Sequence, residues 1–350
     1  MASMRRIIAI SLALIMLAAF AACSTAPVAP ANSAPSAAAP APEAPATPAS
    51  DEPIYVGFVQ VGAESDWRMA NTKSMQETFT EANGYKFEMV DAQQKTDKQI
   101  TAIRDFIQKD VDYIVLAPNT EAGWDTVLSE AKDAGIPVII VDRMIQTNDV
   151  SLFTAWVGSN FKKEGYDAVI ALENALKAKG VADDAEINIV TLQGTMGSSA
   201  QIGRTDGFAE KMVFHTNWKM LDKQSGDFTQ EKGQEVMEAF LKAYPNINVV
   251  IAENDNMAFG AITAIKAAGK TCGPKGDITV VSFDAVRAAF ESMIAGDIDV
   301  DVECNPLHGP RVAGIIDALE AGQAVDKIAY VEESTFYAAD AAAIIDSRAY

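Results

Sequence analysis

Residues 113–143 read YIVLAPNTEAGWDTVLSEAKDAGIPVIIVDR, and this stretch decides the fold class of the chain. Two short apolar runs, Tyr113–Ala117 and Val138–Val141, enclose a helical pattern over Gly123–Ala134. Runs that are apolar at consecutive positions are typical of strands that helices cover on both faces of a parallel sheet. The stretch therefore predicts a strand–helix–strand unit with a right-handed crossover.

The same alternation of strand and helix continues in both directions along the chain. Further strands are expected at Ile54–Val59, Lys86–Val90, Leu152–Val157, Ile187–Leu192, Lys219–Lys223, Val249–Ala252, Ile278–Phe283 and Ile298–Glu303. Further helices are expected at Arg68–Ala82, Asp97–Gln108, Phe161–Lys179, Ser199–Met212, Thr229–Ala243, Asn256–Ala268 and Val286–Ala295. So many strands exceed one typical sheet. We therefore predict an α/β protein with two doubly wound parallel-sheet domains in tandem.

The first residues have the pattern of an export signal. Arg5 and Arg6 precede the apolar run Ile7–Ala22, and small residues lead directly to Cys23. This arrangement resembles a bacterial lipoprotein signal, in which the cysteine thiol is lipidated and becomes the new N-terminus. We predict a signal peptide at residues 1–22 and lipidation at Cys23. The alternative is an uncleaved membrane helix, because the run is close to the ~17 residues that span a bilayer.

The segment from Cys23 to Glu52 is expected to be a tether. Residues 24–52 consist almost entirely of Ala, Pro, Ser and Thr, which leaves no apolar set to bury. Such a composition favours an extended spacer between a membrane and a folded body. A glycosylated stalk is the alternative, and it would also act as a spacer.

Charge and cysteine content exclude several classes of function. The formal net charge is −20, whereas binding nucleic acid requires clustered Lys and Arg, so no nucleic-acid partner is expected. Cys272 and Cys304 flank different predicted strands at opposite ends of a parallel sheet, which argues against a disulfide. With His215 and His308 as the only histidines, we expect neither a metal site nor a cofactor.

Polar and aromatic side chains gather directly after the predicted strands, where open parallel sheets bind their ligands. These clusters are Gln60–Arg68, Pro118–Thr120, Asp142–Arg143, Gln193–Ser199, Gly226–Thr229, Glu253–Asn256, Asp284 and Asn305–Pro306. Carboxylates, amides and guanidinium groups can form paired hydrogen bonds to adjacent hydroxyls, and flat aromatic rings can cover apolar C–H faces. This combination predicts a site for a polyhydroxylated ring.

Each cluster also has a structural explanation. Asp66, Asp227 and Asn256 precede helices and could be ordinary N-caps. Trp67 could pack in the core, and Arg204 could be a solvated arginine on its helix. The pair Asp142–Arg143 is harder to explain in this way, because a charged pair that ends an apolar strand needs a partner or a ligand.

Several of these segments together resemble the type I periplasmic sugar-binding proteins of ABC transporters. The resemblance covers essentially Pro53 to Tyr350 and is strongest to the galactofuranose-binding members. The motifs that carry it are Gln60–Arg68, Ala92–Lys95, Gly123–Leu128, Val138–Arg143, Leu192–Ser198, Gly226–Phe228, Asn254–Ala261 and Val280–Asp284.

The resemblance implies two lobes joined by three hinge strands with a sugar held in the cleft between them. It implies an N-terminal lobe at 53–158 plus 305–327 and a C-terminal lobe at 159–304 plus 328–350. The implied ligand-binding residues are Glu64, Trp67, Arg68, Asp142, Arg143, Arg204, Phe228, Asn254, Asp284 and Asn305. Ribose-type members carry Gln before Leu-Pro near the third hinge, whereas this chain has Cys304-Asn305-Pro306, so Asn305 departs from the family pattern.

The expected function is that of the substrate-binding protein of an ABC sugar importer, which binds a monosaccharide such as galactofuranose or a similar furanose or pentose. The expected protein is an exported, lipid-anchored monomer at the outer face of the cytoplasmic membrane or in the periplasm, with a membrane permease as its partner. The alternative is a receptor for another small polyol or signal molecule that feeds a chemotaxis or sensor system. An enzyme is not expected, because no Gly-x-Ser-x-Gly elbow or triad context is present. A repressor of the lactose-repressor family would carry a DNA-binding headpiece where this chain has an export signal.

Overall fold

The computed structural model describes residues 52–350 of the chain. The predicted signal peptide, the lipidation at Cys23 and the tether as far as Asp51 lie outside the described residues. Within residues 52–350, no helix combines the length and the apolar character needed to cross a membrane.

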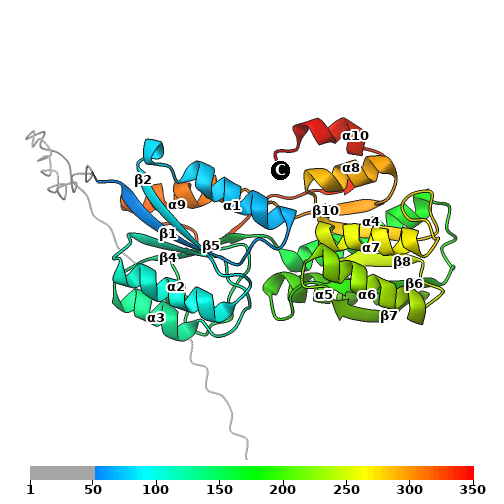
Figure 1. Cartoon of the computed structure of the whole chain (residues 1–350), viewed down its shortest axis with the longest axis horizontal. Coiled ribbons are helices and arrows are strands. Elements are labelled where there is room, and N and C mark those ends of the chain that lie inside the picture. The colour runs from blue at the N-terminus through cyan, green and yellow to red at the C-terminus, as the bar shows by residue number, and fades with distance from the viewer. Residues whose placement is uncertain (1–51) are drawn as a thin grey trace, which may run out of the picture. The chain divides into compact units, whose positions relative to one another are not determined.

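The first lobe is built on a six-stranded sheet whose spatial order is β2-β1-β3-β4-β5-β11 (Figure 1). The strands are β1 (Ile54–Gln60), β2 (Tyr85–Asp91), β3 (Tyr113–Leu116), β4 (Val138–Val141), β5 (Ala155–Gly158) and β11 (Ile328–Tyr330). All of these strands pair in parallel, as the apolar runs predict. This order is a doubly wound arrangement that changes direction between β1 and β3, where such sheets bind ligands.

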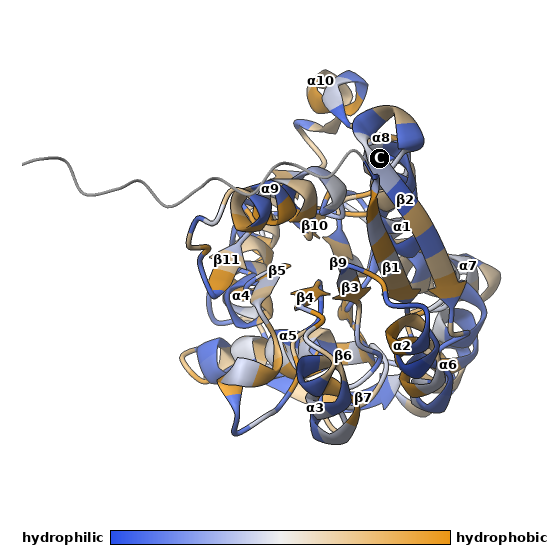
Figure 2. Cartoon of the chain, turned by 90° about the vertical axis from the view of Figure 1, so that its left-hand side faces the viewer, coloured by the Kyte–Doolittle hydropathy of each residue, from blue (hydrophilic) through white to orange (hydrophobic). Residues whose placement is uncertain are grey.

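Helices cover both faces of this sheet because each strand is buried on both sides. On one face, α1 (Asp66–Thr78) and α9 (Gly309–Glu320) pack through Met75, Val312 and Ile316. On the other face, α2 (Thr96–Gln108) and α3 (Asp125–Asp133) pack through Phe106 and Leu128. Figure 2 shows orange strands such as β1 between helices that carry blue residues on their outer sides. The sequence alternation therefore produces a three-layer lobe with its core against the sheet.

The second lobe repeats the order of the first, with strands β7-β6-β8-β9-β10-β12. The strands are β6 (Ile187–Gln193), β7 (Trp218–Ser225), β8 (Val249–Ala252), β9 (Thr279–Asp284), β10 (Val300–Glu303) and β12 (Thr335–Tyr337). All pair in parallel except β12, which runs antiparallel to β10. The helices α4 (Phe161–Ala178) and α5 (Ser199–Met212) cover one face, and α6 (Gln230–Ala243), α7 (Asp255–Ala267) and α8 (Arg287–Ala295) cover the other. A short helix, α10 (Ala341–Ile344), follows near the C-terminus.

Three segments connect the two sheets, and they are hydrogen-bonded to one another. They run from β5 to α4, from β10 to α9 and from β11 to β12. Val331 N–H donates to the Gly158 carbonyl at 3.0 Å, and Glu303 N–H donates to the Ser334 carbonyl at 2.8 Å. The predicted two-lobe fold with three connections is therefore present.

The predicted lobe boundary near residue 328 is wrong by a few residues. We assigned 328–350 to the second lobe, but Ile328–Tyr330 pairs with β5 in the first sheet. The chain changes lobe only afterwards, before Thr335 pairs with Val302. The three-residue strands β11 and β12 carry too short a pattern for the sequence to reveal them.

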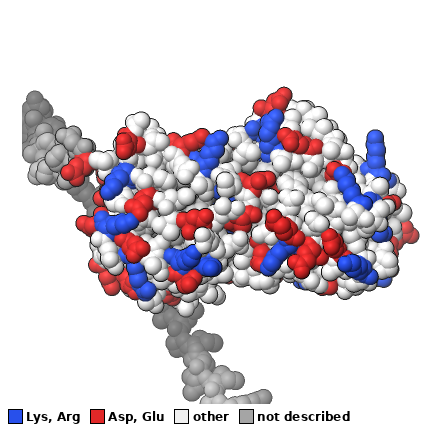
Figure 3. All heavy atoms as spheres, in the orientation of Figure 1, with Lys and Arg blue, Asp and Glu red and all other residues white. Residues whose placement is uncertain are grey.

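Charges of both signs are mixed on the face of the molecule drawn in Figure 3. Lys and Arg alternate there with Asp and Glu, without a broad basic area.

Candidate functional site

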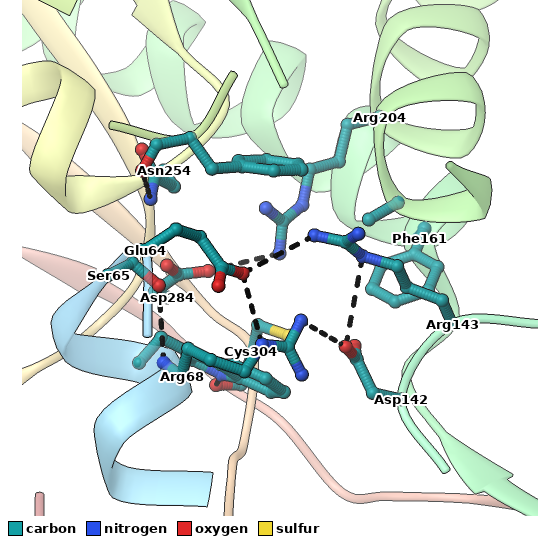
Figure 4. A pocket seen from close by; sticks show the side chains of 13 residues that line it. Glu64, Ser65, Arg68, Asp142, Arg143, Phe161, Arg204, Asn254, Asp284 and Cys304 are labelled. Carbon is teal, nitrogen blue, oxygen red and sulfur yellow. Dashed lines mark hydrogen bonds and ion pairs between the residues drawn. The ribbon is translucent and has the colours of Figure 1, made fainter. Parts of the chain in front are cut away.

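Loops from the carboxyl ends of both sheets enclose one pocket of about 280 Å³ (Figure 4). Nine of the ten predicted ligand-binding residues line it, together with four that were not predicted. The lining consists of Glu64, Ser65, Trp67, Arg68, Asp142, Arg143, Phe161, Ala200, Arg204, Phe228, Asn254, Asp284 and Cys304. Charged, amide and aromatic side chains make up most of this lining, which is the combination that suits a small polar ligand with a flat apolar face.

The first lobe contributes a buried group of two guanidinium and two carboxylate side chains. Arg68 Nη2 lies 2.7 Å from Asp142 Oδ2, and Arg68 Nε lies 3.1 Å from Glu64 Oε1. Arg143 faces the same carboxylates at 3.7 Å from Glu64 and 3.9 Å from Asp142. All four side chains are no more than 4% exposed. The loop after β1 and the loop after β4 thus place opposite charges on one side of the pocket.

Burial and neighbouring charges set the ionisation of this group. Burial alone would raise the pKa of Asp142, but the charges of Arg68 and Arg143 outweigh it and lower that pKa. Burial and the charge of Arg68 lower the pKa of Arg143 to about 10, and Asp142 and Glu64 offset only part of this effect. Asp142 is therefore an ionised acceptor at neutral pH, and both arginines are charged donors.

The second lobe contributes Arg204 with two buried carboxyl groups. Arg204 Nε lies 2.6 Å from Glu164 Oε2, and Arg204 Nη2 lies 3.2 Å from Asp284 Oδ1. Arg204 is only 3% exposed, so the alternative of a solvated arginine is wrong. Burial raises the pKa of both Glu164 and Asp284, and Arg204 offsets only part of that effect. A donor that approaches Asp284 would favour its ionised form.

Aromatic rings form two sides of the pocket. Trp67 Nε1–H donates to the Cys304 carbonyl at 2.6 Å, which fixes its ring against the β10–α9 connection. The guanidinium of Arg68 lies 4.7 Å from the Trp67 ring, and that of Arg143 lies 5.1 Å from the Phe228 ring. Trp67 therefore lines the pocket as well as packing in the core.

Two buried polar atoms in the pocket have no protein partner among residues 52–350. They are Glu64 Oε2 and Arg68 Nη1. A buried acceptor or donor without a partner costs about 1–3 kcal/mol or more. A ligand with hydroxyl groups could satisfy both atoms, because each hydroxyl donates one hydrogen bond and accepts others.

Backbone contacts between the lobes close the cleft around this pocket. Asp66 N–H donates to Asn256 Oδ1 at 3.0 Å, and Met144 N–H donates to Ser199 Oγ at 2.8 Å. A third contact joins Glu121 N–H to the carbonyl of a glycine in the loop after β6 at 2.9 Å. The described conformation is thus a closed one, which explains why so many charged side chains are buried.

One predicted site residue lies outside the lining. Asn305 N–H donates to Glu333 Oε1 at 2.8 Å, and its side-chain oxygen accepts from Leu307 N–H at 2.9 Å. The side chain therefore stabilises the turn into α9 instead of reaching the pocket. Cys304, one residue earlier, takes the place in the lining.

The predicted N-caps lie one to two residues away from the observed ones. Ser65 caps α1, Thr229 caps α6 and Asn254 caps α7. Asn254 does so while it also lines the pocket, since its Oδ1 accepts from Met257 N–H at 2.9 Å and its Nδ2 donates to the Phe228 carbonyl at 3.1 Å. Asp66, Asp227 and Asn256 are therefore not caps, and Asn256 instead forms the contact between the lobes.

The residues missed from sequence are Ser65, Phe161, Ala200 and Cys304. Ser65 lies inside the cluster Gln60–Arg68 after the first strand, so its position indicated that it could line the site. Phe161 and Ala200 each lie in the first turn of a helix and have no polar group that points to a ligand. Only the fold, which brings the N-termini of α4 and α5 to the cleft, reveals them.

One group within residues 52–350 could offer metal ligands. Glu164, Cys304 and Glu333 place ligand atoms within 4.8 Å of one another. Arg204 already pairs with Glu164, and Glu333 Oε1 accepts from Ser159 Oγ–H at 2.5 Å and from Asn305 N–H. The ion pair and the hydrogen bonds thus occupy Glu164 Oε2 and Glu333 Oε1, whereas Glu164 Oε1 has no partner among residues 52–350. Burial raises the pKa of Cys304 well above its ordinary value, which disfavours the thiolate that would bind a metal.

Gly194 is expected to be essential for the position of Phe228. A Cβ at residue 194 would lie 1.9 Å from Phe228 Cζ, so Gly194→Ala must displace the ring from the pocket. We expect at least a tenfold loss of ligand affinity by titration calorimetry. Gly314→Ala in α9 is the matched control, because a Cβ there meets nothing within 4 Å. Equal effects of both substitutions on affinity would show that Phe228 does not contact the ligand.

Comparison with known proteins identifies the family. Residues 56–308 match the periplasmic binding protein domain. The chain belongs to the periplasmic binding protein family. The chain is 39% identical over 301 residues to the galactofuranose-binding protein YtfQ of Escherichia coli K12, which covers 83% of this chain and 89% of that protein.

Solved structures of this family share both the fold and the sequence. One from Mycobacterium smegmatis in complex with β-D-fucofuranose is 41% identical with a TM-score of 0.79, and covers 84% of this chain and 95% of its own. The binding component of the arabinose ABC transporter of Shewanella sp. ANA-3, bound to α- and β-L-arabinofuranose, is 39% identical with a TM-score of 0.79 and the same coverage. The chain therefore has the type I periplasmic binding protein fold, and like its relatives it is a binding protein and not an enzyme.

Proposed function

We propose that this periplasmic binding protein holds one monosaccharide in the closed cleft and delivers it to an ABC permease. The observation that carries the proposal is the pocket itself, in which charged groups from both lobes converge between aromatic rings. Asp142 and Arg143 come from one lobe, and Arg204 and Asp284 come from the other. Two unpartnered atoms, Glu64 Oε2 and Arg68 Nη1, leave hydrogen-bonding capacity for a ligand.

The polar groups of the pocket can supply a useful affinity. A micromolar dissociation constant corresponds to about −8 kcal/mol. Hydrogen bonds to charged groups contribute about 1.5–3 kcal/mol each. A few such bonds and two aromatic faces therefore supply this binding free energy even after the free-energy cost of closing the cleft is subtracted. A ligand that contacts both lobes binds the closed form better than the open one, and this difference shifts the hinge equilibrium.

The ligand class is a furanose or a similar pentose. The relatives named above bind galactofuranose, fucofuranose and arabinofuranose, and this support is what favours a furanose here. Discrimination among sugars would follow the match of each hydroxyl to its partner, because a buried charged group without a partner is heavily penalised.

The second part of the proposal concerns the lipid anchor and the tether. Export and a diacylglycerol group on the Cys23 thiol would keep the monomer beside its permease. Such a group has two acyl chains, which hold a protein at a membrane far better than one chain. The Ala/Pro-rich tether would provide reach and a raised effective concentration. A receptor for another small polyol in a chemotaxis or sensor system is the alternative that would use the same pocket.

A panel of ligands tests the proposal. Ligands that bind only the folded state raise the melting temperature by mass action. Thermal-shift measurements with L-arabinose, D-galactose, D-fucose, D-ribose and myo-inositol should show the largest shifts for sugars that populate furanose forms. A panel in which no sugar raises the melting temperature would contradict the proposal, and a shift with myo-inositol alone would favour the polyol receptor.

A further inference from the structure

The turn that carries Asp284 into the pocket has an unfavourable backbone conformation. Asp284 has a φ of 110° and Ala285 a φ of 60°, and neither is glycine. Left-handed conformations of this kind cost about 1–3 kcal/mol each and persist only when surrounding groups hold them. The groups that hold this turn therefore also determine where the Asp284 carboxylate points (Figure 4).

Two buried aspartates hold the backbone of the turn. Ala285 N–H donates to Asp301 Oδ1 at 3.1 Å, and Val286 N–H donates to Asp255 Oδ2 at 2.9 Å. Arg348 Nη2–H adds a third contact at 2.9 Å to the Ala285 carbonyl. The turn is thus fixed by side chains from β10, α7 and the C-terminal segment.

Both aspartates are buried and lie outside the lining of the pocket. Asp255 and Asp301 are both 0% exposed, and neither lines the pocket. Asp255 Oδ1 accepts from Ser282 Oγ–H at 2.5 Å, whereas Asp301 Oδ2 has no donor among residues 52–350. The two carboxyl groups are neighbours, because they accept from the consecutive amides of Ala285 and Val286, and because Ser282, which donates to Asp255, is the partner of Asp301 in the β9–β10 register. A hydrogen bond between them requires a proton on one of them.

We propose that Asp255 and Asp301 are positioning residues that share one proton, hold Ala285 and Val286, and thereby aim Asp284 at the ligand. The role of Asp284 rests on the proposed function, whereas the shared proton and the restrained turn can be measured without a ligand. Two negative charges buried side by side would repel each other strongly, so the singly protonated pair is the stable form.

The electrostatic surroundings support the shared proton. Burial and the charge of Asp301 raise the pKa of Asp255 well above its ordinary value. Burial, and to a lesser extent the charge of Asp284, raise the pKa of Asp301 to about 7, although the contact with Asp255 and the charge of Arg348 oppose the change. The folded protein thus keeps a proton that the unfolded chain releases near pH 4, so this pair contributes stability at low pH that is lost as pH rises towards about 7.

Amide exchange tests the restraint on the turn without any ligand. In Asp301→Ala, we expect the amides of Ala285 and Val286 to exchange at least tenfold faster with solvent deuterium than in the wild type. Asp299→Ala is the matched control, because Asp299 is a buried aspartate of the same segment that accepts from Val280 N–H at 2.8 Å. Unchanged exchange at Ala285 and Val286 in Asp301→Ala, or the same acceleration in the control, would overturn the proposal.

The conservative variant Asp301→Asn tests the proton. Its amide can donate permanently to Asp255 while its oxygen still accepts from Ala285 N–H. We expect L-arabinose affinity within about threefold of the wild type, against a loss of at least tenfold in Asp301→Ala. We also expect the melting temperature of the wild type to fall more steeply between pH 5 and pH 8 than that of Asp301→Asn. Parallel pH profiles would refute the shared proton even if Asp301→Ala does not fold.

The two proposals fail in different ways. If the wild type does not bind L-arabinose or any other sugar of the panel, the proposed function is wrong, and the exchange and pH experiments still decide the role of the pair. If sugar binds and Asp301→Ala keeps wild-type affinity, the positioning role is wrong while the proposed function stands.

Discussion

Replacement of Asp142 by asparagine is expected to lower sugar affinity at least about 100-fold. It should also lower the melting temperature, because Arg68 and Arg143 lose the charge of a buried partner. Asp142 is the ionised acceptor shared by Arg68 and Arg143, at 2.7 Å and 3.9 Å. The substitution removes the charge-assisted hydrogen bonds that sugar hydroxyls would donate to the Asp142 carboxylate. Each such bond contributes about 1.5–3 kcal/mol, and each 1.4 kcal/mol is a factor of ten in affinity. Asparagine is the appropriate substitute because Asp142 has a φ of 62°, which asparagine adopts at a lower cost than alanine.

Titration calorimetry and thermal unfolding check this prediction. Asp149→Asn is the matched control, because Asp149 is an exposed aspartate of the same lobe that pairs with Lys132 at 3.8 Å. Its affinity should equal that of the wild type. Near-wild-type affinity in Asp142→Asn would show that the pocket assignment in the first lobe is wrong.

Replacement of Arg204 by alanine is expected to abolish measurable binding and also to destabilise the second lobe. Arg204 is the cation that faces both Glu164 and Asp284, and it also donates to the Glu253 carbonyl. Removal of one partner from a buried ion pair costs about 3–5 kcal/mol, because the remaining charge is buried without compensation. Opening of the cleft would let water reach these carboxyl groups and reduce this cost.

The loss of stability in Arg204→Ala should depend on pH. Burial already raises the pKa of Glu164 and Asp284 in the folded state, and loss of Arg204 removes the charge that lowers them. Acids with raised folded-state pKa values stabilise the protein at low pH and lose that contribution as pH rises. The melting-temperature deficit of the variant should therefore grow from pH 5 to pH 8.

Two further variants give this prediction its controls. Arg204→Lys retains the positive charge but lacks the planar set of guanidinium N–H donors. Compared with Arg204→Ala, it should recover part of the stability and little of the sugar affinity. Arg104→Ala removes an exposed arginine that pairs with Glu130 through two contacts of 2.7 Å and 2.8 Å. Surface pairs contribute about 0–1 kcal/mol, so this variant should melt close to the wild type. A deficit in Arg204→Ala that is independent of pH would contradict the assigned ion pairs.

The sequence predicted most of the fold because its apolar runs are short, continuous and regularly spaced. Val138–Val141 and Val249–Ala252 begin and end where predicted. The strand predicted at Leu152–Val157 instead begins at Ala155, after a 3-10 turn at Val150–Leu152. Apolar character alone could not separate that turn from the strand, because Leu152 is buried in the same core as the strand residues.

Nine of the ten residues proposed from the sequence line the candidate pocket, because carboxyl ends of parallel strands meet at one edge of a sheet. Asp142 and Arg143 could be placed in this way because a charged pair after an apolar strand needs a partner. The sequence did not distinguish Asn305 from Cys304, because the two residues are adjacent in the β10–α9 connection and only the fold decides which side chain faces the pocket. The sequence did not indicate the Asp255–Asp301 pair, because Asp255 on α7 and Asp301 on β10 are 46 positions apart and meet only where both lie beside Ser282 of β9.

A crystal structure of the protein with the sugar that gives the largest thermal shift tests the central claim most directly. The account predicts one ring in the pocket, with hydroxyls within hydrogen-bond distance of Asp142 and Arg143 from one lobe and of Arg204 and Asp284 from the other. A sugar held by one lobe alone, or bound outside this pocket, would contradict the account.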